Sequence, residues 1–441
     1  MARPNLPINI DTTYGDSAAD ASIRAHQLHH DAIHAVVNDF DMQNAVTAGY
    51  VPIGNGSALI TRTLTATDVT STVNVVNVRD FGAVGNGSSD DTSAIAAAAA
   101  ALTPGSRLFF PAGTYATSAT VSITVPCYIE GAGGGFTTSN PQTDVGVVLV
   151  NRTSGAGIFR VSSDAVHFRR LFFTSYGGPA AAIASKATAI TFERGDYCSV
   201  AECVFTGWYK WLWFRNCASW VVRDNHFQLA AKYGIHVQNG AAPDNGDQIL
   251  TNNMLASNAP WNTEVLVRQE SGGGLKAIGN KFLCPGVPGA KWAFELAIAD
   301  GANTSILIVS ANSFENFSTG SIRITHAGPY FTGTFVKVNV TGNQFTGGQS
   351  TGPIIDIRGR SPGVGLGDIL ISANMFDGNG SKPASFITVN NAARVSIAAN
   401  TFYNAPVGVV VGAAATTTAV PASNSYYAVP IHVSGIVYNA G

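Results

Sequence analysis

A six-residue pattern recurs along the second half of the chain: an apolar residue, two variable residues, asparagine, one variable residue and phenylalanine. Seven copies keep the asparagine, and they are centred on Asn225, Asn253, Asn280, Asn312, Asn343, Asn374 and Asn400. Two earlier copies keep the phenylalanine but have Leu171 and Cys203 in place of the asparagine. Successive copies lie between 22 residues (Cys203 to Asn225) and 32 residues (Asn280 to Asn312) apart.

This period is typical of one coil of a β-solenoid. Alternate residues of a strand point to opposite faces, so the apolar residue and the phenylalanine are expected to fill the core. The asparagine is expected at a bend between two strands. Stacked coils are ~4.8 Å apart, so each asparagine can bond to its copy in the next coil and satisfy its buried amide. The Leu pattern of a leucine-rich repeat is absent. The sequence therefore predicts an all-β fold, a right-handed single-stranded parallel β-helix.

The regions before and after the repeats have a different pattern. Residues 16–40 carry apolar residues at roughly helical spacing, which predicts a helical contact between subunits. The histidines in this stretch are polar positions in the favoured interpretation and metal ligands in the alternative one. They are His26, His29, His30 and His34. We expect residues 1–75 to form an oligomerisation and attachment segment, 76–404 the coils, and 405–441, where the repeat breaks, a closing or subunit-contact segment.

Composition and charge exclude several classes of function. Only 12% of residues are charged and the formal net charge is −2, which gives no support to nucleic-acid binding. No apolar run reaches the ~18 residues that a membrane span requires, and the N-terminus lacks the apolar core of a signal peptide. Five cysteines without a C-x-x-C pair favour neither disulfides nor a zinc site. We therefore expect synthesis in a cytoplasm, no membrane insertion, no metal and no cofactor.

Residues 78–115 carry a family resemblance. The motifs are Asp80-Phe81-Gly82-Ala83, Asp90-Asp91-Thr92 and Phe110-Pro111-Ala112-Gly113-Thr114-Tyr115. This stretch resembles the opening of the pectate-lyase-like β-helix superfamily, especially its phage tailspike members. Asp90 and Asp91 are interpreted as the cap of a helix over about 90–102, rather than as a catalytic pair. That helix would cover the open end of the solenoid.

A second strand in each coil lies between one phenylalanine and the next asparagine. Aligning these strands by their inward apolar residues predicts a set of solvent-facing side chains: Trp211, Trp213, Arg215, His236, Gln238, Glu264, Arg268, Glu295, Arg323, Thr325, Asp356 and Arg358. Aromatic rings stack on sugars and arginines bind carboxylates, and the resemblance implies that this sheet and its flanking loops form a glycan groove. The alternative is a solvated sheet with cross-strand ion pairs, such as Asp356 near Arg323.

The candidate catalytic residues are Glu264, Glu295 and Asp356. The alignment places Glu264 and Glu295 on adjacent coils two positions apart, a spacing that suits a pair of carboxylates in glycoside hydrolysis. Lyase chemistry would instead use a base such as His236 beside an arginine such as Arg323. The sequence leaves open whether the protein is an enzyme.

The resemblance implies a phage tail spike or fibre protein that recognises, and in one alternative depolymerises, a host cell-surface polysaccharide. It further implies a homotrimer located in the virion, made in the host cytoplasm and attached to phage tail or baseplate proteins through residues 1–75. A non-enzymatic receptor-binding or structural tail protein is the main alternative. A free polysaccharide lyase or hydrolase is less favoured, since it would not need residues 1–75.

Overall fold

The computed structural model describes residues 50–54, 59–63, 74–133, 146–153, 155–175, 177–238, 247–258, 263–270, 273–284, 290–298, 304–326, 335–347, 350–359, 366–378, 383–412, 417–420 and 423–435. The chain divides into two units, Met1–Val73 and Asn74–Gly441. In the first unit, β1 (Tyr50–Gly54) and β2 (Leu59–Thr63) form an antiparallel pair. The helix predicted over 16–40, with its four histidines, lies outside the described residues.

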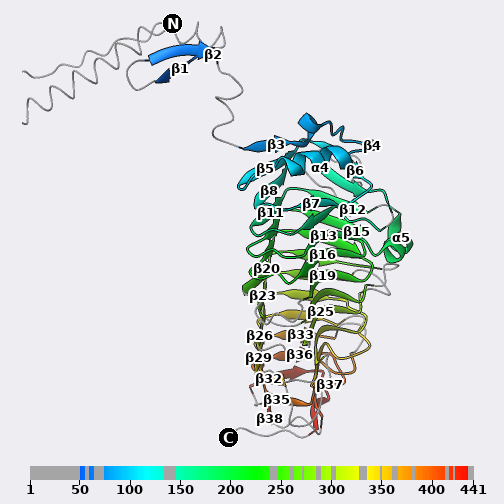
Figure 1. Ribbon diagram of the computed structural model, residues 1–441. Coiled ribbons are helices and arrows are strands. Elements are labelled where there is room, and N and C mark those ends of the chain that lie inside the picture. Colours follow the sequence, from blue (N-terminus) through cyan, green and yellow to red (C-terminus); the bar gives the residue numbers. More distant parts are fainter. Residues whose placement is uncertain are drawn as a thin grey trace, which may run out of the picture. The chain divides into compact units, whose positions relative to one another are not determined.

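The second unit is a stack of coils whose strands form three parallel sheets (Figure 1). Sheet 1 contains β7 (Val121–Ile123), β10 (Phe159–Val161), β13 (Thr188–Phe192), β16 (Lys210–Arg215), β19 (Tyr233–Gln238), β22 (Val265–Glu270), β25 (Trp292–Ile298), β28 (Gly320–His326), β31 (Ile355–Arg358), β34 (Ile387–Asn390), β37 (Val407–Val411) and β40 (Ile431–Gly435).

Sheet 2 contains β3 (Val75–Asn77), β5 (Ser106–Phe110), β8 (Cys127–Gly131), β11 (Val166–Arg169), β14 (Ser199–Ala201), β17 (Val221–Arg223), β20 (Asp247–Thr251), β23 (Gly273–Ile278), β26 (Thr304–Ser310), β29 (Phe335–Thr341), β32 (Leu366–Ser372), β35 (Ala392–Ala398) and β38 (Thr417–Ala419). Sheet 3 contains β4 (Asn86–Asp90), β6 (Gly113–Thr117), β9 (Val147–Asn151), β12 (Phe172–Ser175), β15 (Val204–Trp208), β18 (His226–Ala230), β21 (Met254–Ala256), β24 (Lys281–Leu283), β27 (Ser313–Glu315), β30 (Gln344–Thr346), β33 (Met375–Asp377), β36 (Thr401–Tyr403) and β39 (Ser425–Tyr427). The predicted right-handed parallel β-helix is confirmed.

The asparagines form the predicted ladder at the bend between sheets 2 and 3. The backbone N–H and the side-chain Nδ2 of Asn312 both donate to Oδ1 of Asn343, each at 3.0 Å. The residue before each of the seven repeat asparagines is in the left-handed region, as at Gly279 (φ 68°) and Ala311 (φ 54°). The ladder extends one coil further than the sequence pattern, because Asn400 donates in the same way to Asn424.

The phenylalanines of the repeats, and Leu255 in the repeat of Asn253, point into the core, as predicted. Phe282, Phe314, Phe345 and Phe376 are stacked with ring centroids 4.7, 4.8 and 4.7 Å apart. All four are at most 1% exposed. Identical side chains recur at the coil spacing, and the rings pack face to face with interplanar angles of 3°, 9° and 9°.

The first coil is closed by a helix, as predicted. After the 3-10 turn η1 (Val78–Phe81), helix α4 (Thr92–Ala100) lies across the N-terminal end of the coils (Figure 1). Its Ile95 and Ala98 are fully buried in the core of the solenoid. Both acidic residues serve this junction: Asp90 accepts from the backbone N–H of Thr92, and Asp91 accepts from the backbone N–H groups of Val84 and Gly85.

Three further features complete the unit. A second helix, α5 (Gly178–Ser185), follows β12. Strands β37 to β40 continue the three sheets past residue 404, where we expected the coils to end, so part of the predicted closing segment is itself solenoid.

All five cysteines are buried free thiols, and burial raises the pKa of each to about 12. No helix among the described residues is long and apolar enough to cross a membrane.

Candidate glycan-binding site

Six side chains of sheet 1 form one row on its outer face, which we call the outward row. It consists of Trp213, His236, Arg268, Glu295, Arg323 and Asp356, on strands β16, β19, β22, β25, β28 and β31. Their neighbours in each strand, such as Leu212 and Phe214, point inward and are buried. The parallel pairing therefore brings together residues that are more than 140 positions apart in the sequence (213 to 356).

A second row lies two residues further along each strand. It contains Arg215, Gln238, Glu270, Ala297, Thr325 and Arg358. Gln238 is half-buried, and Arg215 donates to Glu193 at 2.9 Å. Arg358 is mostly exposed, and its Nε lies 2.7 Å from Oδ2 of Asp356.

The predicted alignment is wrong by two residues at β22. Arg268, rather than Leu266, pairs with His236 and Glu295. The inward position that follows Arg268 is occupied by a polar residue, Gln269, which is 1% exposed. Because the predicted alignment required apolar inward residues, it took Val265 and Val267 as the inward pair instead of Val267 and Gln269.

This shift separates Glu264 from Glu295. The backbone of Glu264 lies beside Lys291, four strand positions before Glu295, or ~13 Å along the strand. Its carboxylate instead pairs with Lys232. Burial by itself raises the pKa of Glu264, but the hydrogen bond from Lys232, together with the positive charges of Lys232, Arg268 and Lys291, lowers it overall. Glu264 and Glu295 do not form the carboxylate pair that we predicted.

Trp211 is also not part of the outer face. The residue is 0% exposed, its ring packs against Phe227 at 5.1 Å, and its Nε1 donates to the carbonyl of Gln228 at 2.9 Å. The side-chain alternation breaks at the corner where β16 begins. Gly234 in the next coil leaves the space that the indole fills, since a Cβ there would collide with the ring of Trp211.

Glu295 anchors two arginines. Its Oε2 accepts from Arg268, and its Oε1 accepts from Arg323, with Nε at 2.8 Å. Glu295 is 1% exposed although it lies on the outer face, because the two guanidinium groups cover it. A guanidinium presents only donors, so both carboxylate oxygens act as acceptors here. This geometry suits an anchor that orients two arginines better than a proton donor.

Aromatic rings of sheet 1 lie against cations; Trp213 and Tyr233 are half-buried, whereas Trp292 is 4% exposed. The Trp213 ring has Lys210 Nζ at 3.5 Å and the Arg215 guanidinium at 4.8 Å from its centroid. Arg268 lies 5.2 Å from the ring of Tyr233, and Arg323 lies 5.4 Å from the ring of Trp292. Lys210, Tyr233 and Trp292 share one register position, at the start of their strands. The sequence alignment missed them because it began one residue later.

His236 and Glu270 form a polar contact beside Trp213. Nε2 of His236 lies 3.1 Å from Oε1 of Glu270, a polar contact that becomes an ion pair only when the imidazole is protonated. Burial lowers the pKa of His236, so the imidazole is neutral near pH 7. For Glu270, burial alone raises the pKa, but contacts with His236 and Arg268 outweigh it and lower the pKa to about 2.

Asp356 differs from the other carboxylates of the row. It is 0% exposed, and neither of its oxygens accepts a hydrogen bond. The only cation at ion-pair distance within the described part of the chain is Arg358, on the Oδ2 side. A buried carboxylate that accepts no hydrogen bond is unusual in a native structure, which marks Asp356 as a candidate for ligand contact. Within the described ranges, no three histidine, cysteine or acidic side chains are grouped as metal ligands.

These groups predict a loss of stability in acid. Burial lowers the pKa of His167, His226 and His236, so the unfolded chain takes up protons first as the pH falls below about 6.5. Glu270 adds a second loss between about pH 4.5 and pH 2. We expect a lower thermal unfolding midpoint at about pH 5 than at about pH 7.5, and a smaller difference in His236→Gln. An equal or higher midpoint in acid would contradict these assignments.

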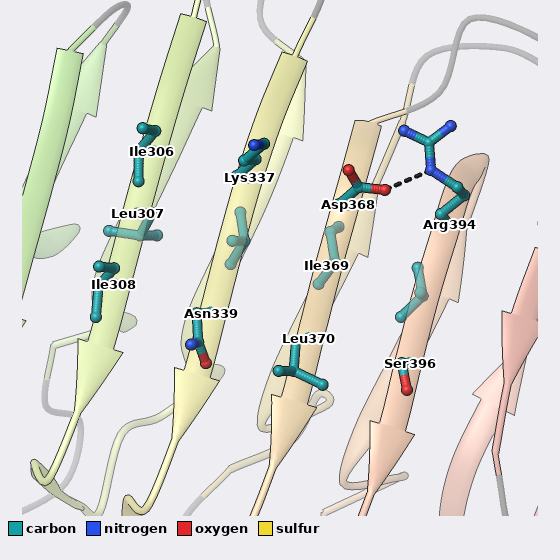
Figure 2. A pocket seen from close by; sticks show the side chains of 12 residues that line it. Ile306, Leu307, Ile308, Lys337, Asn339, Asp368, Ile369, Leu370, Arg394 and Ser396 are labelled. Atoms are coloured by element: carbon teal, nitrogen blue, oxygen red, sulfur yellow. Dashed lines mark hydrogen bonds and ion pairs between the residues drawn. The ribbon is translucent and has the colours of Figure 1, made fainter.

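A separate groove of 540 Å³ lies on the outer face of sheet 2 (Figure 2). Strands β26, β29, β32 and β35 supply its lining, in which Ile306, Ile308 and Leu370 are the main apolar side chains. The ion pair between Asp368 and Arg394 lies at one end of the groove, as Figure 2 shows. No aromatic ring lines this groove, so it lacks the usual platform for a sugar.

Comparison with known proteins agrees with this architecture. Residues 75–274 match the family described as rhamnogalacturonase A/epimerase, pectate lyase-like. The tailspike protein of E. coli bacteriophage HK620, in complex with a pentasaccharide, is similar with a TM-score of 0.62 and 16% identity over 90% of this chain and 73% of that chain.

DFA-IIIase from Arthrobacter chlorophenolicus A6, in complex with GF2, is similar with a TM-score of 0.57 and 17% identity over 79% of this chain and 94% of that chain. No curated protein sequence matches the chain. The predicted resemblance to tailspikes and other pectate-lyase-like β-helices is therefore confirmed, and at these low identities the structural similarity shows the shared fold alone.

Proposed function

We propose that the outward row and the aromatic residues beside it bind a polysaccharide. The observation that carries this proposal is the contact between rings and cations on sheet 1: Trp213 with Lys210 and Arg215, Tyr233 with Arg268, and Trp292 with Arg323. Sugar rings present apolar C–H faces to aromatic rings and hydroxyls to arginine forks. A flat parallel sheet offers such contacts at a regular ~4.8 Å spacing, which suits an extended chain of repeating units.

The relatives support this assignment through their fold. The HK620 tailspike is in complex with a pentasaccharide, and the Arthrobacter enzyme is in complex with GF2. We propose that this protein is likewise a tail spike or fibre protein that recognises a host cell-surface glycan. Under this proposal it acts as a homotrimer in the virion, and residues 1–75 attach it to phage tail or baseplate proteins. The apolar groove of sheet 2, with Ile306, Ile308 and Leu370, is the face that we assign to subunit contact.

We further propose that Asp356 is the carboxylate that reacts if the bound glycan is cleaved. Glu295 and Asp356 occupy the same register position two coils apart, so their backbones are ~10 Å apart, at the upper limit of the carboxylate spacing in inverting glycosidases. Both oxygens of Glu295 are engaged by arginines, whereas Asp356 keeps an unbonded oxygen. A non-cutting receptor-binding spike is the second candidate, and the engaged state of Glu295 favours it.

Asp356→Asn is expected to abolish shortening of the polysaccharide while reducing glycan affinity less than tenfold, because the amide keeps the shape but loses the acid and base chemistry. The measurement is gel filtration of glycans incubated with the full chain. Shortening with new ultraviolet absorption would indicate a lyase, and shortening without it a hydrolase. Undiminished shortening by Asp356→Asn would exclude this residue, and bound but intact glycan with the wild-type protein would indicate a receptor-binding spike.

A further inference from the structure

Lys210 is a buried lysine on the outer face without an acidic partner. It is 8% exposed, and its ammonium group lies 3.5 Å from the centroid of Trp213 and 6.0 Å from that of Tyr233. Among the described residues, no carboxylate lies within ion-pair distance of it. Lysine is almost never this buried unless it is paired, because desolvation of the ammonium opposes burial.

Two other polar atoms beside Lys210 lack partners. The Nε1–H of Trp213 is buried and donates to no acceptor, and Nδ1 of His236 makes no hydrogen bond. The rings of Trp213 and His236 are parallel, with centroids 6.0 Å apart on adjacent coils. Since Glu270 lies against Nε2, it favours the imidazole proton there, which leaves Nδ1 as an acceptor. One buried donor and one buried acceptor thus lie without hydrogen-bond partners beside the Lys210 ammonium group.

The charge of this face has the opposite sign to that of the chain. Strands β16, β19, β22, β25, β28 and β31 carry five cations (Lys210, Arg215, Arg268, Arg323 and Arg358) and three carboxylates (Glu270, Glu295 and Asp356). Five minus three gives +2, whereas the whole chain has a formal charge of −2. An excess of cations in a protein this poor in charge favours an acidic ligand here.

We propose that Lys210, Trp213 and His236 form a subsite for an anionic sugar residue. A carboxylate, sulfate or phosphate substituent accepts from the Lys210 ammonium and from Nε1–H of Trp213, and a neighbouring sugar hydroxyl donates to Nδ1 of His236. These are charge-assisted bonds in a largely desolvated place, so they discriminate strongly against a neutral sugar. This inference rests on the proposed glycan-binding function and specifies its substrate class.

The electrostatics around Lys210 predict a pH dependence of this binding. Burial lowers the pKa of Lys210 to about 8; Glu270 opposes the shift, and Arg215 and Arg268 add to it. The neutral His236 and the ring of Tyr233 also face the ammonium group. Affinity for an anionic glycan is therefore expected to fall as the pH rises through about 8, and this fall is expected to disappear in Lys210→Arg, whose guanidinium stays charged.

The test is binding of the full chain to an array that carries uronic acid, sulfated, phosphorylated and neutral polysaccharides, including carboxyl-reduced copies of the uronic acid chains. We expect the wild-type protein to bind anionic chains only. Its affinity for them should fall at least tenfold in Lys210→Met, return to the wild-type value in Lys210→Arg and stay unchanged in Lys281→Met. Lys281 is the matched control because it lies on sheet 3 and pairs with Glu315 at 3.2 Å. The uronic, sulfated and phosphorylated arms identify the anionic substituent.

The outcomes separate the two proposals. Binding to a neutral glycan that is unaffected by Lys210→Met would overturn the anionic subsite and leave glycan binding intact. Equal binding of uronic acid chains and their carboxyl-reduced copies would also overturn it. No binding to any arm would overturn both proposals. Correct folding of Lys210→Met is checked by its thermal unfolding midpoint, and the pH profile of Lys210→Arg remains informative if Lys210→Met fails to fold.

Discussion

Replacing Asn312 with alanine is expected to lower the free energy of unfolding by about 4 kcal/mol, because it leaves several buried groups unbonded at once. Oδ1 of Asn312 accepts from the backbone N–H and the Nδ2 of Asn280, and its Nδ2 donates to the carbonyl of Ala277 and to Oδ1 of Asn343. Asn312 is 2% exposed, so water cannot replace these bonds without opening the coil. Denaturant unfolding of the full chain measures the loss.

Asn339→Ala provides the matched control for this prediction. Asn339 is an asparagine on β29, in the solenoid like Asn312, but its half-buried side chain points outward and its Oδ1 accepts no hydrogen bond. Its replacement should change the free energy of unfolding by less than about 1 kcal/mol. If the two variants lose equal stability, the ladder is not a main source of the solenoid's stability.

Glu295→Ala is expected to destabilise the protein by about 3–5 kcal/mol and to abolish glycan binding. Removing one partner of a buried ionic cluster leaves the other charges buried and uncompensated. Here Arg323 would lose its carboxylate partner and Arg268 would keep only Glu270, at 2.7 Å. The two guanidinium groups also lie against the rings of Trp292 and Tyr233. Both the stability and the shape of the proposed binding face therefore depend on this one carboxylate. Denaturant unfolding and array binding measure the two effects.

Glu264→Ala controls for the loss of a glutamate on the same sheet. Glu264 makes a partly exposed ion pair with Lys232, and such pairs contribute about 0–1 kcal/mol. We expect Glu264→Ala to keep most of the stability and of the glycan affinity. A Glu295→Ala variant that stays as stable as Glu264→Ala and still binds glycans would show that the Arg–Glu–Arg cluster does not hold the binding face.

The fold could be predicted because its main determinants recur in the sequence. Most coils have a buried asparagine at a bend and a phenylalanine two positions later, and this pair recurs from Asn225 to Asn400 except at Asn253, which is followed by Leu255. The last ladder member, Asn424, escaped the pattern because Tyr426 replaces the phenylalanine; Tyr426 still stacks on Phe402 at 5.1 Å. For the same reason we predicted that the coils end near residue 404, although strands β37 to β40 continue the sheets beyond it.

The candidate site could be predicted only in part, because strand register and corner geometry are not local properties. Alternation places Trp213, His236, Glu295 and Arg323 correctly, since apolar residues flank each of them in their strands. It fails at β22, where the inward position is polar. It also cannot show that the chain turns before β16, which buries Trp211 and brings Lys210 to the outer face.

The central claim is that sheet 1 contains the glycan-binding face, and array binding of one variant pair tests it most directly. Trp213→Ala/Tyr233→Ala removes two rings of this face, whereas Tyr128→Ala removes a 51% exposed ring from sheet 2. We predict that the Tyr128→Ala variant binds the same glycans as the wild-type protein and that the double variant loses at least tenfold in affinity. If the double variant keeps its glycan affinity and Tyr128→Ala loses it, the account is contradicted and the glycan-binding site lies on sheet 2.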